Sequence, residues 1–286
     1  MEETNMGTLY LCATPIGNLE DMTYRVVRLL KEVDLIAAED TRNSIKLLNH
    51  FEIKTPMTSY HEFNKIEKAH QLIQKLREGK DIALITDAGM PGISDPGEDL
   101  VRLCHEAGID VSIAPGACAC VSALALSGMP SRRFCFEAFL PKDKQLKKDI
   151  YEQLKTESRT IILYEAPHHL KKTLQELYDQ LGNRKITLVK EITKRYENVF
   201  VTTFAEALDF YNRQEPRGEY VILIEGKSFA EQRDEERKNW EMMSLEEHMA
   251  HYENQGIARK DAMKLVAKDR GVSKRDVYNE LVRRES

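Results

Sequence analysis

The chain has 286 residues, and its 42 Lys and Arg against 47 Asp and Glu give a formal net charge of -5 at pH 7. Hydrophobic residues make up 42% and charged residues 31%, a balance that fits two globular domains, or two with a small appendage, and excludes a disordered chain. No uncharged apolar stretch approaches the roughly 18 residues that cross a bilayer, and the acidic N-terminus is unlike a secretory signal. Five cysteines without a Cys-x-x-Cys pair indicate reduced thiols. We therefore expect a cytoplasmic protein with no membrane partner, whose overall charge does not favour nucleic acid.

Short apolar runs alternate with amphipathic stretches through the first half of the chain. The pattern predicts helices over residues 24–33 and 100–107, and strands over residues 8–13, 34–38, 81–86 and 110–114. Strands separated by helices are typical of a parallel α/β sheet. Ligands of such sheets bind at the carboxyl ends of the strands. The loops that follow the strands are therefore the first candidates for a site, and they comprise residues 14–18, 39–42, 87–97 and 115–116.

A turn cluster at residues 127–131 separates a second set of elements from the first. The pattern there predicts strands over 134–140, 160–164, 186–190, 199–203 and 220–225, and helices over 144–155, 167–181 and 205–211. We expect an N-terminal α/β domain over residues 7–128, a second α/β domain over 131–228, and an extension over 229–286.

The composition of the extension differs from that of the rest of the chain. Residues 231–247 are rich in acidic side chains and are interpreted as a solvated helical linker. Residues 254–286 hold nine Lys and Arg against five acids, a local charge of +4. The spacing predicts two helices that are separated at residues 271–273, with Ser273 capping the second. The first helix is predicted to have an apolar face and a separate row of lysines. The apolar face consists of Ile257, Ala258, Ala262, Leu265 and Val266, and the row consists of Lys260, Lys264 and Lys268. Such a tail indicates either phosphate contact or dimerisation with a solvated face.

The loop over residues 87–97 is the most informative segment, because it places several Gly and Pro residues between a strand and a helix. Glycine lets a ligand approach the backbone closely, and proline limits the shapes of the loop. Asp87 can accept hydrogen bonds from a ribose or an ammonium group. Asp95 and Pro96 are interpreted as the N-cap and first residue of a helix. The alternative for the whole segment is a plain strand-to-helix turn.

Two charged clusters are candidates for acid–base chemistry. Residues 39–42 join two acids and a base at a strand end, where a helix N-cap with a local ion pair explains them equally well. Residues 190–197 form a similar cluster, for which the alternative is a charged surface turn. Cys118 and Cys120 favour small-residue packing over redox chemistry.

Other motifs are excluded. Gly226-Lys227-Ser228 lacks the upstream glycine of a phosphate-binding loop, and no Gly-x-Gly-x-x-Gly follows a predicted strand. The histidine pairs at residues 168–169 and at 248 and 251 have no Cys or Glu companions, so we interpret them as solvated and predict no metal.

A set of motifs occurs in the order and spacing of one protein family: Thr14-Pro15-Ile16-Gly17-Asn18, Ala38-Glu39-Asp40-Thr41-Arg42, Asp87-Ala88-Gly89-Met90-Pro91, Asp95-Pro96-Gly97, Pro115-Gly116, Phe136-Glu137-Ala138-Phe139-Leu140-Pro141 and Tyr164-Glu165-Ala166-Pro167-His168. Together they resemble the bacterial small-subunit ribosomal RNA methyltransferase I family, whose members are 2'-O-ribose methyltransferases of the tetrapyrrole methylase fold. The resemblance runs from about residue 7 to the C-terminus.

The resemblance implies two α/β units with S-adenosylmethionine in the cleft between them, followed by a small helix-turn-helix-like extension. It also implies a homodimer that methylates the ribose of a decoding-centre cytidine of 16S rRNA in the 30S subunit. Its motifs assign cofactor contacts to Pro15, Asp87, Ala88, Gly89, Gly92, Ile93, Cys118, Ala119 and Tyr164.

The candidates near the acceptor are Asp40, Arg42, Glu191 and Lys194. Either Glu191 or Asp40 is the expected general base, and the cations are expected to contact phosphate. Two alternatives remain open: a methylase of a small tetrapyrrole on the same fold, and a non-catalytic nucleic-acid-binding regulator. The basic tail has no obvious use in the first, and the loops rich in Gly and Pro have none in the second.

Overall fold

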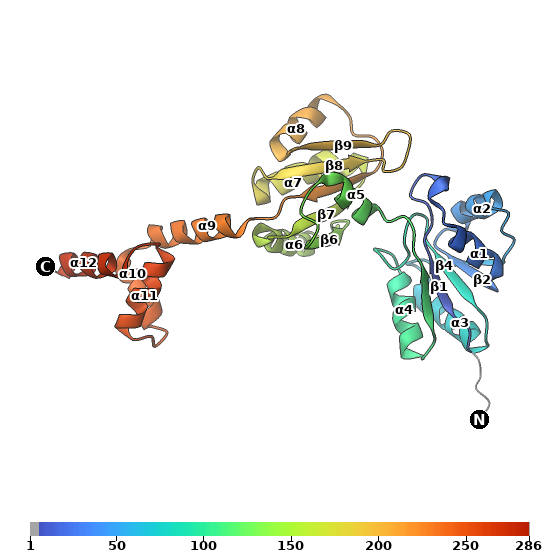
Figure 1. The fold of residues 1–286 in the computed structure, drawn as a ribbon, viewed down its shortest axis with the longest axis horizontal. Helices are drawn as coiled ribbons and strands as arrows, with labels where there is room; N and C mark the ends of the chain where they lie inside the picture. Colours follow the sequence, from blue (N-terminus) through green and yellow to red (C-terminus); the bar gives the residue numbers. More distant parts are fainter. Residues whose placement is uncertain (1–5, 286) are drawn as a thin grey trace. The chain divides into compact units, whose positions relative to one another are not determined.

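The computed structural model describes residues 6–285 and begins with a parallel sheet (Figure 1). The strand order is β3-β2-β4-β1-β5. The bounds are β1 (Leu9–Cys12), β2 (Leu35–Ala38), β3 (Met57–Ser59), β4 (Ile82–Ile85) and β5 (Val111–Ala114). All four pairings in this sheet are parallel, which confirms the sheet type predicted from the alternation of elements. The short strand β3 was not predicted.

Helices cover both faces of this sheet. They are α1 (Tyr24–Glu32), α2 (Thr41–His50), α3 (Lys65–Arg77) and α4 (Gly97–Glu106), with a short 3-10 helix η1 (Leu19–Asp21). Leu9 and Ala37 face a core that includes α3 and α4, whereas Cys12 and Ile36 face a core that includes α1 and α2. Successive strand residues therefore alternate between two buried faces, which is why the strands are continuously apolar.

The second sheet is mixed. Its order is β6-β7-β10-β8-β9, in which only the β6–β7 pair is parallel. The bounds are β6 (Phe134–Ala138), β7 (Thr160–Glu165), β8 (Lys185–Lys190), β9 (Asn198–Thr203) and β10 (Tyr220–Ile224), with α6 (Lys144–Thr156), α7 (Pro167–Leu181) and α8 (Phe204–Arg213). The apolar helix α5 (Ala119–Ser127) packs on the sheet through Ala123 and Leu124. Gly128 ends it in a left-handed conformation, with φ 68°.

Contacts group both sheets into one unit of the chain, which extends to Tyr151 and includes Thr160–Glu225. The other unit comprises Glu152–Arg159 and the residues from Gly226 onward. The division into three domains at the predicted boundaries therefore stays a prediction.

The second unit contains the helices α9 (Phe229–Met242), α10 (Leu245–Glu253), α11 (Arg259–Asp269) and α12 (Lys274–Glu285). As predicted, the hydroxyl of Ser273 caps α12 by accepting from the Asp276 amide at 3.2 Å. Ala262 and Val266 are buried on the predicted apolar face of α11. The three lysines of the predicted row, Lys260, Lys264 and Lys268, are exposed.

Two parts of the tail prediction are wrong. The segment over residues 231–247, interpreted as a solvated linker, contains most of α9, whose described side chains are mostly exposed, but it also contains the start of α10, where Leu245 is buried in a core with residues of α11 and α12. His248 is fully buried and stacks on the Trp240 ring with centroids 4.1 Å apart, so it is not solvated. Its neighbour His251 is exposed, as expected. The many acids around residue 245 gave no indication that α10 has an apolar face, which became evident only from its packing against α11 and α12.

Among the described residues, the structure contains no helix that is both long and apolar enough to cross a membrane. Nor do three or more metal-ligating side chains of these residues gather in one place.

Candidate functional site

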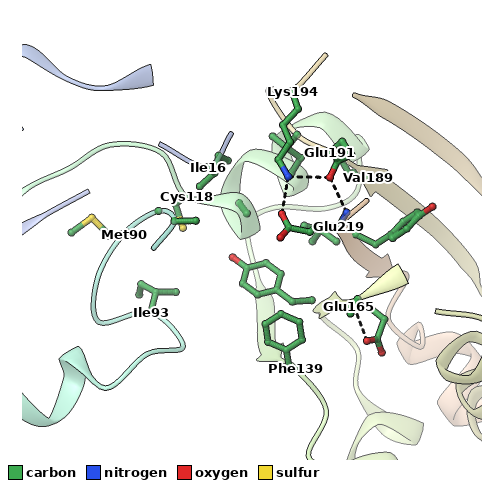
Figure 2. Close-up of a pocket in the computed structure, with 18 residues that line it drawn as sticks. Ile16, Met90, Ile93, Cys118, Phe139, Glu165, Val189, Glu191, Lys194 and Glu219 are labelled. Atoms are coloured by element: carbon green, nitrogen blue, oxygen red, sulfur yellow. Dashed lines mark hydrogen bonds and ion pairs between the residues drawn. The ribbon is translucent and has the colours of Figure 1, made fainter. Parts of the chain in front are cut away.

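A cavity of about 270 Å³ lies in the first unit (Figure 2). It is enclosed by loops of the first sheet and by the edge of the second sheet where β7 and β8 end and β10 begins. Its walls are mainly apolar, with a cluster of charged side chains at one side. The first half of the chain and the start of α5 contribute Ile16, Ala88, Gly89, Met90, Ile93, Cys118 and Ala119. The second sheet and its loops contribute Phe139, Tyr164, Glu165, Ala166, Val189, Glu191, Ile192, Lys194, Glu219, Tyr220 and Val221.

Backbone pairing brings the first loop and the long loop together at this cavity. Thr14 and Gly89 exchange two backbone hydrogen bonds, of 2.9 and 3.1 Å. Gly89 has φ 90°, a conformation that favours glycine, and a Cβ there would lie 3.2 Å from Ile16. The absence of a side chain at Gly89 therefore lets the two loops pair closely beside the cavity.

The rest of the long loop is organised by Asp95. Its carboxylate accepts from the amides of Gly92, Ile93 and Gly97 at 3.0, 3.0 and 2.8 Å. The helix α4 begins at Gly97 with Pro96 as its N-cap, so the prediction of Asp95 as N-cap and Pro96 as first helical residue is wrong by one position. The carboxylate folds the loop back on itself, which a simple cap would not do.

Aromatic side chains form the wall opposite the loops. The Tyr164 hydroxyl accepts from the Cys120 amide at 3.0 Å, and its ring meets Phe139 edge-on at 5.6 Å. Burial raises the pKa of Tyr164, so its hydroxyl stays protonated. Cys120, in the first turn of α5, packs in the core, in keeping with the predicted packing role, while Cys118 faces the cavity with its sulfur 3.7 Å from that of Cys120.

The charged side of the cavity is formed by Glu191, Lys194 and Glu219. The Lys194 ammonium lies 3.0 Å from Glu191 Oε1 and 2.8 Å from Glu219 Oε2 (Figure 2). Glu191 Oε1 also accepts from the Glu219 amide at 2.9 Å. Burial raises the pKa of Glu191, but the hydrogen bonds from the Glu219 amide and Lys194 outweigh it and leave the pKa below its ordinary value. Burial also opposes the charge of Lys194, yet its two carboxylate partners raise its pKa.

The backbone that presents this cluster is strained. Glu191 has φ 52° and Thr193 has φ 63°, and a non-glycine residue in this region costs about 1–3 kcal/mol. The Glu191 carboxyl fits only because Gly218 lacks a side chain, since a Cβ there would lie 2.5 Å from Glu191 Cγ. Strain of this kind persists where the surrounding contacts hold it, and it gathers at functional sites.

The other predicted cluster has a different setting. Asp40 is the N-cap of α2, accepting from the Arg42 amide at 2.8 Å, and it forms a two-bond ion pair with the Arg42 guanidinium. The Arg42 hydrogen bonds lower the pKa of Asp40 to about 2. Asp87 accepts from the Asp40 amide at 3.2 Å and from the Asn43 side chain at 3.1 Å. These contacts match the alternative of a capped helix with a local ion pair.

The structure thus brings eight of the thirteen predicted site residues to the cavity: Ala88, Gly89, Ile93, Cys118, Ala119, Tyr164, Glu191 and Lys194. The remaining five do not line it: Pro15, Asp87, Gly92, Asp40 and Arg42. Glu219 was missed as a site residue. A single acid after a glycine, outside any recognised motif, gave no indication of a role. Met90 and Phe139 were also missed as site residues, although both lie inside the motifs that carried the resemblance.

Comparison with known proteins identifies the family. Residues 8–208 match the family of Tetrapyrrole (Corrin/Porphyrin) Methylases. The Ribosomal RNA small subunit methyltransferase I of Halalkalibacterium halodurans is 48% identical over 278 residues, covering 97% of this chain and 96% of that protein. The protein of the same name from Bacillus subtilis is 46% identical, over 97% of this chain and 94% of its own length.

Solved structures agree on the fold. Diphthine synthase superposes with a TM-score of 0.61 at 13% identity, over 78% of this chain and 91% of that one. The methyltransferase CobJ gives a TM-score of 0.57 at 18% identity, over 77% and 94%. The chain therefore has the tetrapyrrole methylase fold and belongs to the ribosomal RNA small subunit methyltransferase I family.

Proposed function

We propose that this protein transfers the methyl group of S-adenosylmethionine to the ribose 2'-hydroxyl of a decoding-centre cytidine in 16S rRNA. The acceptor in this proposal is the 30S subunit in the cytoplasm, and the enzyme acts as a homodimer. The observation that carries the proposal is the cavity, where the loop over residues 87–97 faces a charged cluster across apolar walls. The names of the relatives support the choice of rRNA.

The residues at the cavity fit S-adenosylmethionine. A volume of about 270 Å³ with mainly apolar walls suits the purine and the thioether chain of such a ligand. The ring of Tyr164 supplies a stacking surface, and the loop over residues 87–97 lines the cavity at Ala88 and Gly89. When bound, the cofactor supplies an electrophilic methyl group on a sulfonium.

The chain's own contribution is to align and deprotonate the acceptor. Alignment of two reactants is worth roughly 7–11 kcal/mol, and a general base adds about 10²–10⁴-fold. Glu191 is the proposed base, because its carboxylate lies at the cavity beside the Lys194 ammonium. Lys194 is proposed to contact the acceptor phosphate through its ammonium. Asp40 and Arg42, the alternative pair, are engaged in capping α2.

The second unit is the proposed RNA-binding element. The row of Lys260, Lys264 and Lys268 is exposed on α11, and Arg275 is exposed on α12. Exposed cations on a small helical bundle suit contact with phosphates and give affinity that falls with salt. Dimerisation through this unit is the competing role, and it predicts that removal of these cations leaves the salt dependence of RNA affinity unchanged.

A methylase of a small tetrapyrrole is the competing enzyme, since the fold accommodates such substrates. The experiment that separates the two gives the enzyme tritiated S-adenosylmethionine and, in parallel, unmethylated 30S subunits or a tetrapyrrole precursor. We expect label in 16S rRNA that resists alkaline hydrolysis at the modified ribose. Label in the tetrapyrrole alone would establish the competing activity. Label in neither, with no binding of S-adenosylmethionine, would leave the non-catalytic regulator.

A further inference from the structure

The strained turn that carries Glu191 and Lys194 is tied to the first loop of the chain by a side-chain hydrogen bond. The Thr193 hydroxyl donates to the Asp21 carboxylate at 2.5 Å, joining residues that are 172 positions apart. Asp21 ends the short helix η1. The Thr193 amide donates to Glu197 at 2.6 Å, so both polar groups of Thr193 are engaged while its φ is 63°.

A second contact lies beside the first. A Cβ built on Gly17 would lie 2.3 Å from Cγ and 2.6 Å from Cε of Lys194. The stem of the lysine therefore crosses the backbone of the first loop where a side chain is missing. Beyond this crossing, the ammonium reaches Glu191 and Glu219 at the cavity (Figure 2).

We propose that Asp21 and Gly17 are positioning residues that hold the Lys194 ammonium at the acceptor side of the cavity. Asp21 holds the turn over residues 191–194 through its hydrogen bond with Thr193. Gly17, which has no side chain, leaves the space that the aliphatic part of Lys194 occupies. Neither residue lines the cavity, so both act through Lys194 and not on the substrate. The inference rests on the proposed role of Lys194 in contacting the acceptor.

The geometry explains why two ties are present. A threonine in the left-handed region relaxes to ordinary backbone angles when nothing restrains it. Such relaxation swings the following residue, and a displacement of about 1 Å at a reacting group costs up to about 100-fold in rate. Neither Asp21 nor Gly17 lines the cavity in which the cofactor is proposed to bind, so we expect cofactor affinity to be independent of both residues.

The first test uses Thr193→Val in the full-length protein. Valine keeps the branched Cβ and its backbone preferences but lacks the hydroxyl, while Thr193→Ser retains the hydroxyl. We expect Thr193→Val to lower the single-turnover methylation rate on 30S subunits by about tenfold, with S-adenosylmethionine affinity unchanged by calorimetry. Thr193→Ser should restore the rate, and Asp21→Ala should reproduce the loss. Glu20→Ala, an exposed acid in the same 3-10 helix, is the matched control and should have the parent's rate.

The second test uses Gly17→Ala, which puts a methyl group in the path of the lysine. Gly17 has φ 149°, so an added side chain strains the backbone whatever surrounds it. The control is therefore the same substitution in a Lys194→Ala background, where the lysine stem is absent. We expect Gly17→Ala to lower the methylation rate of the parent and to cause no further loss in Lys194→Ala. Equal proportional losses in the two backgrounds would assign the effect to backbone strain and overturn the role of Gly17.

A double-mutant cycle separates this inference from the proposed function. In a Lys194→Ala background, Thr193→Val and Asp21→Ala should cause no further loss of rate, because the group they position is gone. Full additive losses in that background would overturn the positioning role. If Lys194→Ala itself keeps the parent's rate, the proposed function of Lys194 fails, and with it the reason for these ties. If Lys194→Ala is slow while Thr193→Val and Asp21→Ala are not, only the positioning inference fails.

Discussion

Two charged clusters with similar sequences have different surroundings in this protein. Asp40 and Arg42 lie at the start of a helix, with the Arg42 side chain 88% exposed and paired to its own helix cap. Glu191 and Lys194 lie at a cavity, on strained backbone, with side chains 18% and 26% exposed. The first arrangement stabilises a helix end, and the second holds a cation and a carboxylate ready for a ligand. Similar residue types therefore predict chemistry only when burial and convergence are added.

The largest effect is expected from the second cluster. Lys194→Ala and Glu191→Gln should lower the single-turnover methylation rate by about 10²–10⁴-fold, the range of a lost acid–base or electrostatic group. Cofactor affinity should change by less than roughly twofold, because these interactions matter mainly in the transition state. Rapid-quench measurements with 30S subunits, and calorimetry with S-adenosylmethionine, check both. Parent-like rates in both variants would move the assignment to Asp40 and Arg42.

Removing cations from the second unit should act on RNA affinity alone. In Lys260→Gln, Lys268→Gln and Arg275→Gln, each lost phosphate contact should flatten the log–log dependence of 30S affinity on salt by about one unit. Truncation after Gly226 should remove most of this dependence while cofactor affinity persists. Filter binding across a salt series measures the slopes. A truncated protein with the parent's affinity and slope would show that the unit does not bind RNA.

A smaller effect is expected at Asp87, which accepts a hydrogen bond from the Asp40 amide and begins the loop that reaches the cavity. Asp87→Ala removes the acceptor for the Asp40 amide and the Asn43 side chain, so the neighbouring residues 88–93 lose their support. We expect weaker S-adenosylmethionine binding by about 1.5–3 kcal/mol, without unfolding. Asp110→Ala, at the exposed start of another strand of the same sheet, is the control. Unchanged affinity by calorimetry would contradict this prediction.

The helix cap itself should matter for stability and little for rate. Asp40→Ala deprives α2 of its N-cap, which lowers the melting temperature by about 2–4 °C in a domain of this size. Asp40→Asn keeps an acceptor for the Arg42 amide and should lose less. A large loss of methylation rate at full occupancy of both substrates would instead identify Asp40 as the base.

The smallest effect concerns the pH dependence of stability at Glu39. Burial raises the pKa of Glu39, and the carboxylates of Asp87, Asp95 and Asp40 add to this. A carboxyl whose folded pKa is raised stabilises the protein at low pH and loses that stability as the pH rises through the folded value. Glu39→Gln should therefore be more stable than the parent near pH 7, and the difference should vanish below the ordinary carboxyl range. Thermal melts between pH 4 and 8 would contradict this if the variant were less stable throughout.

Local sequence patterns predicted four strands of the first sheet, every strand of the second, and the helices α1, α4, α6, α7 and α8, because these elements follow from burial and periodicity. The strand β3 and the helices α2 and α3 were not predicted. The apolar run over residues 82–85 is buried on both faces, and the alternation of elements requires parallel crossovers in the first sheet. The loop over residues 87–97 was recognisable because glycine permits backbone conformations that other residues avoid and proline fixes φ, and both effects are local. The resemblance to a methyltransferase family depended on motifs of this kind, and the comparisons confirmed it.

Only the tertiary structure decided which charged groups converge. Glu219 meets Glu191 from 28 residues away, and Lys194 crosses Gly17 at the other end of the sequence. The burial of His248 likewise depends on a stack with Trp240 from the preceding helix, which no helical pattern reveals. Periodicity records which face of an element is buried, but not which distant element covers it. A site built from side chains of several elements is therefore set by the pairing of those elements, and that pairing is a property of the folded chain.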